Sequence, residues 1–197
     1  EFTIGGKMGN SILEAARKSQ GISQVQLARK AKTFQANISM TESGATDPGI
    51  STVERYLSPL GFTLLAIPTT KSAVAEIAIR IGESVKENKF ARAFRLIIQL
   101  HDDLKSVEPG ICVALTVAPA PSTGSVRHDA LLAGVVEKVL SERKLPIPKW
   151  VSEDSRRLPE PWVVDKYETE AKLIAVRTPK ALLKHNVILD VQEFESV

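Results

Sequence analysis

The stretch GISQVQLARKAKTFQANISMTESG, residues 21–44, decides the fold of the N-terminal part of the chain. Ser23 is a typical helix N-cap, and apolar residues such as Leu27 follow it at helical spacing. A second short helix is expected from about Phe34 to Thr41, and Ser43-Gly44 is a typical stop signal. The stretch therefore predicts two short helices joined by a tight turn.

The composition of these two helices predicts how they pack. We expect a steep crossing locked by four apolar side chains: Leu27, Ala28, Ala31 and Ile38. Small Ala28 would allow the close approach, and Gly44 lies where a chain reversal needs a positive φ. Glu42 is interpreted as structural, paired with backbone or with a basic side chain. The pattern is that of a helix-turn-helix.

The flanking residues predict further elements of the same domain, residues 8–68. One helix is expected from about Ser11 to Ser19, with Asn10 or Ser11 as its N-cap. After a turn, Ser51 is expected to cap another helix, which Gly61 ends. Residues 62–67 are β-branched and aromatic enough for a short strand, whose free edge would pair with a twin from another subunit.

Residues 10–67 resemble the Cro/C1 or XRE class of lambda-repressor-like helix-turn-helix domains. The residues that carry the resemblance are Gly21-Ile22-Ser23-Gln24, Leu27-Ala28, Ala31, Gln35, Ile38-Ser39, Glu42 and Gly44. The resemblance implies a five-helix DNA-binding domain of a transcriptional regulator, most simply a repressor of a double-stranded DNA operator. It also implies that the residues at Gln24 and Gln35 act together.

The N-terminal end of the second helix of such a motif enters the major groove. Gln35 is the first candidate for reading bases, because glutamine can pair with adenine N6 and N7. The further base-reading candidates are Asn37, Ser39 and Met40, the last for a thymine methyl group. Phosphate contacts are expected from Gln24, Thr33 and Ser43.

Two residues depart from the family pattern. Phe34 stands where relatives usually have a Ser or Thr N-cap, so either Thr33 caps the helix or the helix start shifts. Met40 stands where many relatives have Arg, which removes a phosphate contact. Both departures predict modest affinity for one domain and therefore a homodimer on a two-fold operator. The alternative is a helix-turn-helix used only for protein contacts.

The rest of the chain, residues 72–197, is predicted to be a second, mostly helical domain that binds a partner or senses a ligand. Residues 68–71 mark the boundary, and the fold class of the whole chain is mainly α. Apolar periodicity predicts helices near 73–85, 90–104 and 131–140. Residues 111–117 fit a strand or a buried helix equally well, because a short apolar run lacks a decisive period.

Composition narrows the class of protein. Hydrophobic residues make up 43% and charged residues 25% of the chain, with a net charge of +3, as in an ordinary globular protein. The apolar runs are too short for a membrane span. Cys112 is the only cysteine, which fits the cytoplasm, and residues 1–7 are interpreted as an expression-tag remnant.

The sequence offers no convincing catalytic, metal or cofactor site. His101-Asp102 and His128-Asp129 could each offer ligands to a divalent ion, but neither pair has a third ligand at fixed spacing. Phosphate loops and nucleophile motifs are missing, so we expect a protein that is not an enzyme. Trp150 and Trp162 are interpreted as core or interface anchors, with a small-molecule pocket as the alternative.

Two strings in the C-terminal region, residues 158–162 and 185–190, look similar to antitoxins paired with AbiEii-type nucleotidyltransferase toxins. This resemblance implies an antitoxin that represses its own operon and binds its toxin through residues 72–197. The seven basic and nine acidic side chains of residues 151–197 suit a basic partner surface or a solvated face equally. The alternative is a one-component repressor with a small-molecule effector, and an enzyme with an appended DNA-binding module is disfavoured.

Overall fold

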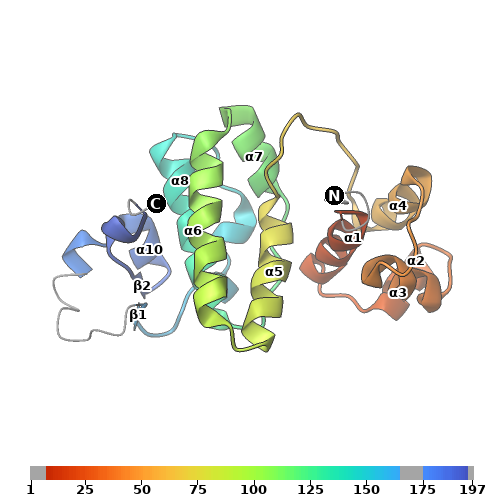
Figure 1. Ribbon diagram of the computed structural model, residues 1–197, viewed down its shortest axis with the longest axis horizontal. Helices are drawn as coiled ribbons and strands as arrows, with labels where there is room; N and C mark the ends of the chain where they lie inside the picture. Colours follow the sequence, from red (N-terminus) through yellow and green to blue (C-terminus); the bar gives the residue numbers. More distant parts are fainter. Residues whose placement is uncertain (1–7, 165–174, 195–197) are drawn as a thin grey trace, which may run out of the picture. The chain divides into compact units, whose positions relative to one another are not determined.

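The computed structural model describes residues 8–164 and 175–194 (Figure 1). The predicted tag remnant, residues 1–7, lies outside the described residues. The chain divides into two compact units, Glu1–Pro68 and Thr69–Val197. Both are mainly helical, which confirms the predicted fold class.

The first unit is a small bundle of short helices around one core. Its elements are α1 (Met8–Ser19), α2 (Gln24–Lys30), α3 (Gln35–Ser43), α4 (Ile50–Leu57) and the 3-10 turn η1 (Ser58–Leu60). Five helices were expected, and the fifth is only this single turn, because Gly61 at φ 78° ends it. The core includes Leu13, Leu27, Ile38 and Leu57, each at most 1% exposed.

Two predicted helix caps are wrong. Helix α1 already includes Met8, so Asn10 and Ser11 lie inside it and cannot cap it. Helix α4 is capped by Gly49, whose extended backbone (φ −61°, ψ 155°) lets its carbonyl accept the first helical hydrogen bonds. Ser51 consequently lies in the first turn, two positions after the capping residue.

The predicted strand at residues 62–67 is also wrong for the single chain. This segment is not a β-strand, because no described segment forms a hydrogen-bonded ladder with it. The alternation expected of a strand is nevertheless present. Phe62 and Leu64 pack against the core of the unit, whereas Leu65 is 78% exposed.

The second unit is built around helix α8 (Val126–Glu142). Every residue from His128 to Leu140 is buried, so this helix has no solvent-facing stripe. Its helical neighbours include α5 (Val74–Lys86), α6 (Phe90–Ser106) and α7 (Pro109–Val117), with α5 and α6 side by side (Figure 1).

Helix α7 settles the ambiguous run at residues 111–117, which is helical rather than extended. Pro109 occupies its first turn, where the missing N–H is harmless. The carbonyl of Thr116 accepts a hydrogen bond from Trp150 Nε1 at 2.9 Å. Trp150, only 2% exposed, is therefore an interior anchor, as predicted.

The C-terminal residues return to α8 in short pieces. These are η2 (Lys149–Ser152), η3 (Asp154–Arg156), β1 (Trp162–Val163), α10 (Lys180–Lys184), β2 (Val187–Ile188) and η5 (Val191–Phe194). The two strands pair in parallel, with Trp162 opposite Val187 and Val163 opposite Ile188. This pairing fixes Trp162 beside residues that are distant in sequence.

Candidate nucleic-acid interface

The start of α2 is fixed by a capping box. The hydroxyl of Ser23 accepts a hydrogen bond from the Gln26 N–H at 3.2 Å, and the Gln26 side chain accepts one from the Ser23 N–H at 2.7 Å. Both bonds satisfy N–H groups that a helix start leaves unpaired. Gln24, the first residue of the helix, is thereby held at a defined place.

Helix α3 is placed by its two buried residues and by its end. Ile38 and Thr41 are buried, so the helix presents the opposite side to solvent. Gly44 ends it in the left-handed region at φ 75°, which confirms the predicted chain reversal. Gln35 lies at the exposed N-terminal end of this helix.

A chain of hydrogen bonds runs from the core of the unit to Gln35. Glu42 forms a bidentate ion pair with Arg17 at 2.6 and 2.8 Å. Its second oxygen also accepts from Gln24 Nε2 at 2.9 Å, and Gln24 Oε1 accepts from Gln35 Nε2 at 2.8 Å. Two residues on α2 and α3, Gln24 and Gln35, are thereby tied to a buried charge pair.

The ion pair between Arg17 and Glu42 lies at the buried end of this chain of hydrogen bonds. The side chains of Arg17 and Glu42 are only 11% and 4% exposed. The hydrogen bond from Arg17 to the Glu42 carboxylate raises the pKa of the guanidinium further above its usual value. The structural role predicted for Glu42 is therefore confirmed, and its basic partner is Arg17.

The hydrogen bond from Gln35 to Gln24 uses only part of the Gln35 side-chain amide. A side-chain amide carries two N–H donors and one carbonyl acceptor. Gln24 accepts one donor of Gln35, so with respect to residues 8–164 and 175–194 one N–H and Oε1 remain for an external partner. A free donor beside a free acceptor is the arrangement that pairs with adenine N7 and N6.

The other candidate residues fall into separate groups. Ser39 is one helical turn beyond Gln35 and half-buried, and Met40 is 40% exposed. Asn37 is half-buried, and its Nδ2 donates a hydrogen bond to Thr33 Oγ1 at 2.9 Å. These two side chains are therefore bonded to each other. Ser43 donates to the Met40 carbonyl at 3.2 Å. Only Gln24 and Gln35 among these residues belong to the chain of bonds from Glu42.

Helix α3 begins after Phe34, a residue without a polar side chain to cap the helix. The backbone of Phe34 is extended and its side chain makes no capping hydrogen bond. Thr33 does not replace it, since the N-cap position is Phe34 itself; the Thr33 hydroxyl accepts a hydrogen bond from Asn37 Nδ2. Phe34, next to Gln35 in the sequence, is 81% exposed. A position where relatives usually have Ser or Thr is a polar one, and this was the sequence signal for its exposure.

Residues 13–67 match the family model described as Helix-turn-helix. The first unit carries a helix-turn-helix domain. This supports the XRE part of the resemblance and a DNA-binding transcriptional regulator. Comparison of the chain with curated proteins and with solved structures finds no match.

Two further observations concern metal binding and membrane-spanning helices. Within residues 8–164 and 175–194, no group of three or more His, Cys, Asp or Glu side chains is placed to hold a metal ion. In the same part of the chain, no helix combines the length and the apolar character needed to cross a membrane.

Proposed function

We propose that this protein reads a DNA operator through Gln35, delivered by α3 to the major groove. The observation that carries the proposal is the hydrogen-bonded chain from Glu42 through Gln24 to Gln35. It holds Gln35 in place before DNA arrives, so less conformational freedom is lost on binding. The exposed side chains of Phe34 and Met40 are further candidates for apolar contact with thymine methyl groups.

The test compares binding of the full chain to its own upstream region and to scrambled DNA at one fixed salt concentration. Gln35→Ala should weaken specific binding by roughly 1–3 kcal/mol, as expected for loss of a bidentate base contact. Binding to scrambled DNA should not change, since phosphate contacts supply it. Gln20→Ala removes the same amide from an exposed residue outside α2 and α3 and should leave both affinities unchanged.

Equal binding of the wild type and Gln35→Ala to the upstream region would contradict base reading by Gln35. If neither prefers its own upstream region, the helix-turn-helix serves another target or contacts protein.

Three finer roles are proposed as well. A homodimer is proposed because one short recognition helix gives modest affinity, and the exposed segment around Leu65 offers an edge for a twin. An antitoxin that binds a nucleotidyltransferase-type toxin through residues 72–197 is supported by the resemblance of its C-terminal strings alone. Action in the cytoplasm follows from the proposed role in transcription.

The second candidate is a repressor whose second unit binds a small effector. A specific observation favours it, namely a cavity in that unit whose lining includes Phe90, His128 and Trp162.

A further inference from the structure

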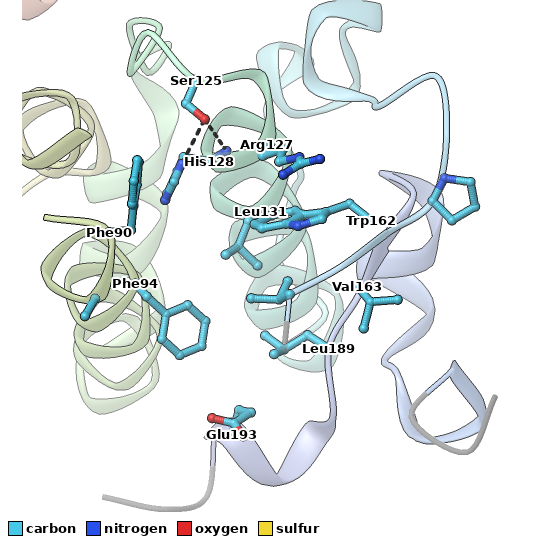
Figure 2. Close-up of a pocket in the computed structure, with 13 residues that line it drawn as sticks. Phe90, Phe94, Ser125, Arg127, His128, Leu131, Trp162, Val163, Leu189 and Glu193 are labelled. Carbon is cyan, nitrogen blue, oxygen red and sulfur yellow. Dashed lines mark hydrogen bonds between the residues drawn. The ribbon is translucent and has the colours of Figure 1, made fainter. Parts of the chain in front are cut away.

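The second unit contains a cavity with a volume of about 1170 Å³. The N-terminal ends of α6 and α8 form part of its lining, together with β1 and the segment that follows β2 (Figure 2). A space of this size can hold a small organic molecule of two or more rings. Its lining determines which chemistry such a molecule would have.

The walls of the cavity are largely aromatic and aliphatic. Phe90 and Phe94 line it from α6, Leu131 from α8 and Trp162 from β1 (Figure 2). Phe90, the first residue of α6, is 53% exposed. Flat aromatic walls of this kind favour a planar apolar ligand, which can stack against them.

His128 supplies a polar group within these walls. Its ring lies between Phe90, with centroids 6.2 Å apart, and Trp162, at 6.3 Å. Nδ1 is bound to the Ser125 hydroxyl at 2.9 Å, whereas Nε2 has no partner within residues 8–164 and 175–194. The residue is only 8% exposed, and burial lowers the pKa of its imidazole. His128 therefore lines the cavity with Nε2 left for a ligand.

Arg127 supplies a positive charge at one side of the cavity. Its guanidinium lies 5.6 Å from the centroid of the Trp162 ring and has no acidic partner among the described residues. Glu193 also lines the cavity, and Figure 2 places it across the apolar residues from Arg127. An anionic group on a ligand would consequently be attracted to the Arg127 side and repelled from the Glu193 side.

We propose that this cavity binds a planar aromatic carboxylate. The ring system lies between the walls formed by Phe90, Phe94 and Trp162. The carboxylate pairs with Arg127 and accepts a hydrogen bond from His128 Nε2–H, in the tautomer whose Nδ1 accepts from the Ser125 hydroxyl. This proposal rests on the effector-binding candidate above and goes further by naming the ligand class and the residues that select it.

Nuclear magnetic resonance of the full chain tests the proposal without DNA, so its outcome is independent of operator reading. The chain has two tryptophans, and only Trp162 lines the cavity, whereas Trp150 is buried against Thr116. The probes are 2-naphthoate and its neutral counterpart 2-naphthalenemethanol. The expected result is a saturable shift of the Trp162 indole N–H signal with little change at Trp150, and tighter binding of the carboxylate.

Three variants assign the binding to the cavity. Arg127→Gln should weaken binding of 2-naphthoate about tenfold and leave the alcohol unchanged, because only the carboxylate uses the charge. Ala91→Phe fills space from an exposed helical position in the lining and should weaken both probes. Arg92→Gln removes an exposed arginine of α6 that does not line the cavity and should affect neither probe.

The proposal is overturned if neither probe shifts the Trp162 signal. It is also overturned if both indole signals shift alike, if the alcohol binds as tightly as the carboxylate, or if Arg127→Gln and Arg92→Gln behave the same.

Discussion

Glu42 shows how one residue connects the core of the helix-turn-helix domain to the exposed N-terminal end of α3. Its carboxylate accepts hydrogen bonds from Arg17 and Gln24, and its side chain is 4% exposed. Removing one member of a buried ion pair leaves the other charge buried without compensation. The sequence predicted a basic or backbone partner for Glu42 but could not select Arg17, which lies 25 positions away.

Glu42→Ala should therefore lower the free energy of unfolding of the first unit by about 3–5 kcal/mol. Chemical denaturation of the full chain, followed by circular dichroism, measures this loss. The unfolding transition of the second unit, followed by tryptophan fluorescence, should be unaffected by the substitution, because both tryptophans lie in that unit. Glu14→Ala is the matched control, since Glu14 pairs with Lys18 at the surface, and it should change stability by less than about 0.5 kcal/mol. A similar loss for both variants would contradict the special role of Glu42.

At the scale of elements, the contact between α8 and α10 depends on the absence of a side chain at Gly134. A Cβ built there would lie 2.7 Å from a methyl carbon of Leu182 and 3.3 Å from its Cα. Leu182 is itself fully buried, so it has little room to move. The close approach in turn brings Glu137 of α8 within hydrogen-bonding distance of His185 at 3.0 Å.

Gly134→Ala should destabilise the second unit by about 1–3 kcal/mol, as overpacking does, despite the higher helix propensity of alanine. Thermal or urea unfolding followed by tryptophan fluorescence gives the value, because Trp150 and Trp162 both report on this unit. Gly110→Ala is the same exchange in α7, where a Cβ would meet nothing within 4 Å. It should be neutral or slightly stabilising, and an equal loss at both glycines would refute the packing argument.

At the scale of the whole molecule, two buried histidines link the stability of the second unit to pH. His101 is fully buried between Asp102 and Lys138, and His128 lies next to Asp129. Burial is the main cause that lowers the pKa of both imidazoles below the ordinary value of about 6.5. As the pH falls through that value, the unfolded chain takes up protons before the folded one does.

The free energy of unfolding should accordingly be highest above about pH 6.5 and should fall below it, by at most about 1.4 kcal/mol per pH unit for each histidine. Urea unfolding at pH 7.5, 6.5 and 5.5 with tryptophan fluorescence measures the slope, in a range above the usual pKa of carboxyl groups. His128→Asn should make the slope shallower. Stability that is constant or rises toward pH 5.5 would contradict the neutral state of these side chains.

The sequence by itself determined the features that depend on near neighbours. The Ser23 cap, the positive φ at Gly44 and the apolar spacing that buries Leu27 and Ile38 all act within one or two helical turns. They were sufficient to predict the helix-turn-helix and the place of Gln35 at the start of α3. The caps at Asn10, Ser11 and Ser51 were wrong, because several residues nearby could serve and only the backbone geometry selects one.

Only the tertiary structure decided what depends on contacts between distant residues. The helical state of residues 111–117 follows from packing against neighbouring elements, since their apolar run has no period of its own. The support of Gln24 by Glu42, and the cavity that unites Phe90, His128 and Trp162, join segments that local patterns treat as independent. Such contacts form when chain segments meet in space, and spacing along the sequence carries no direct signal of that meeting.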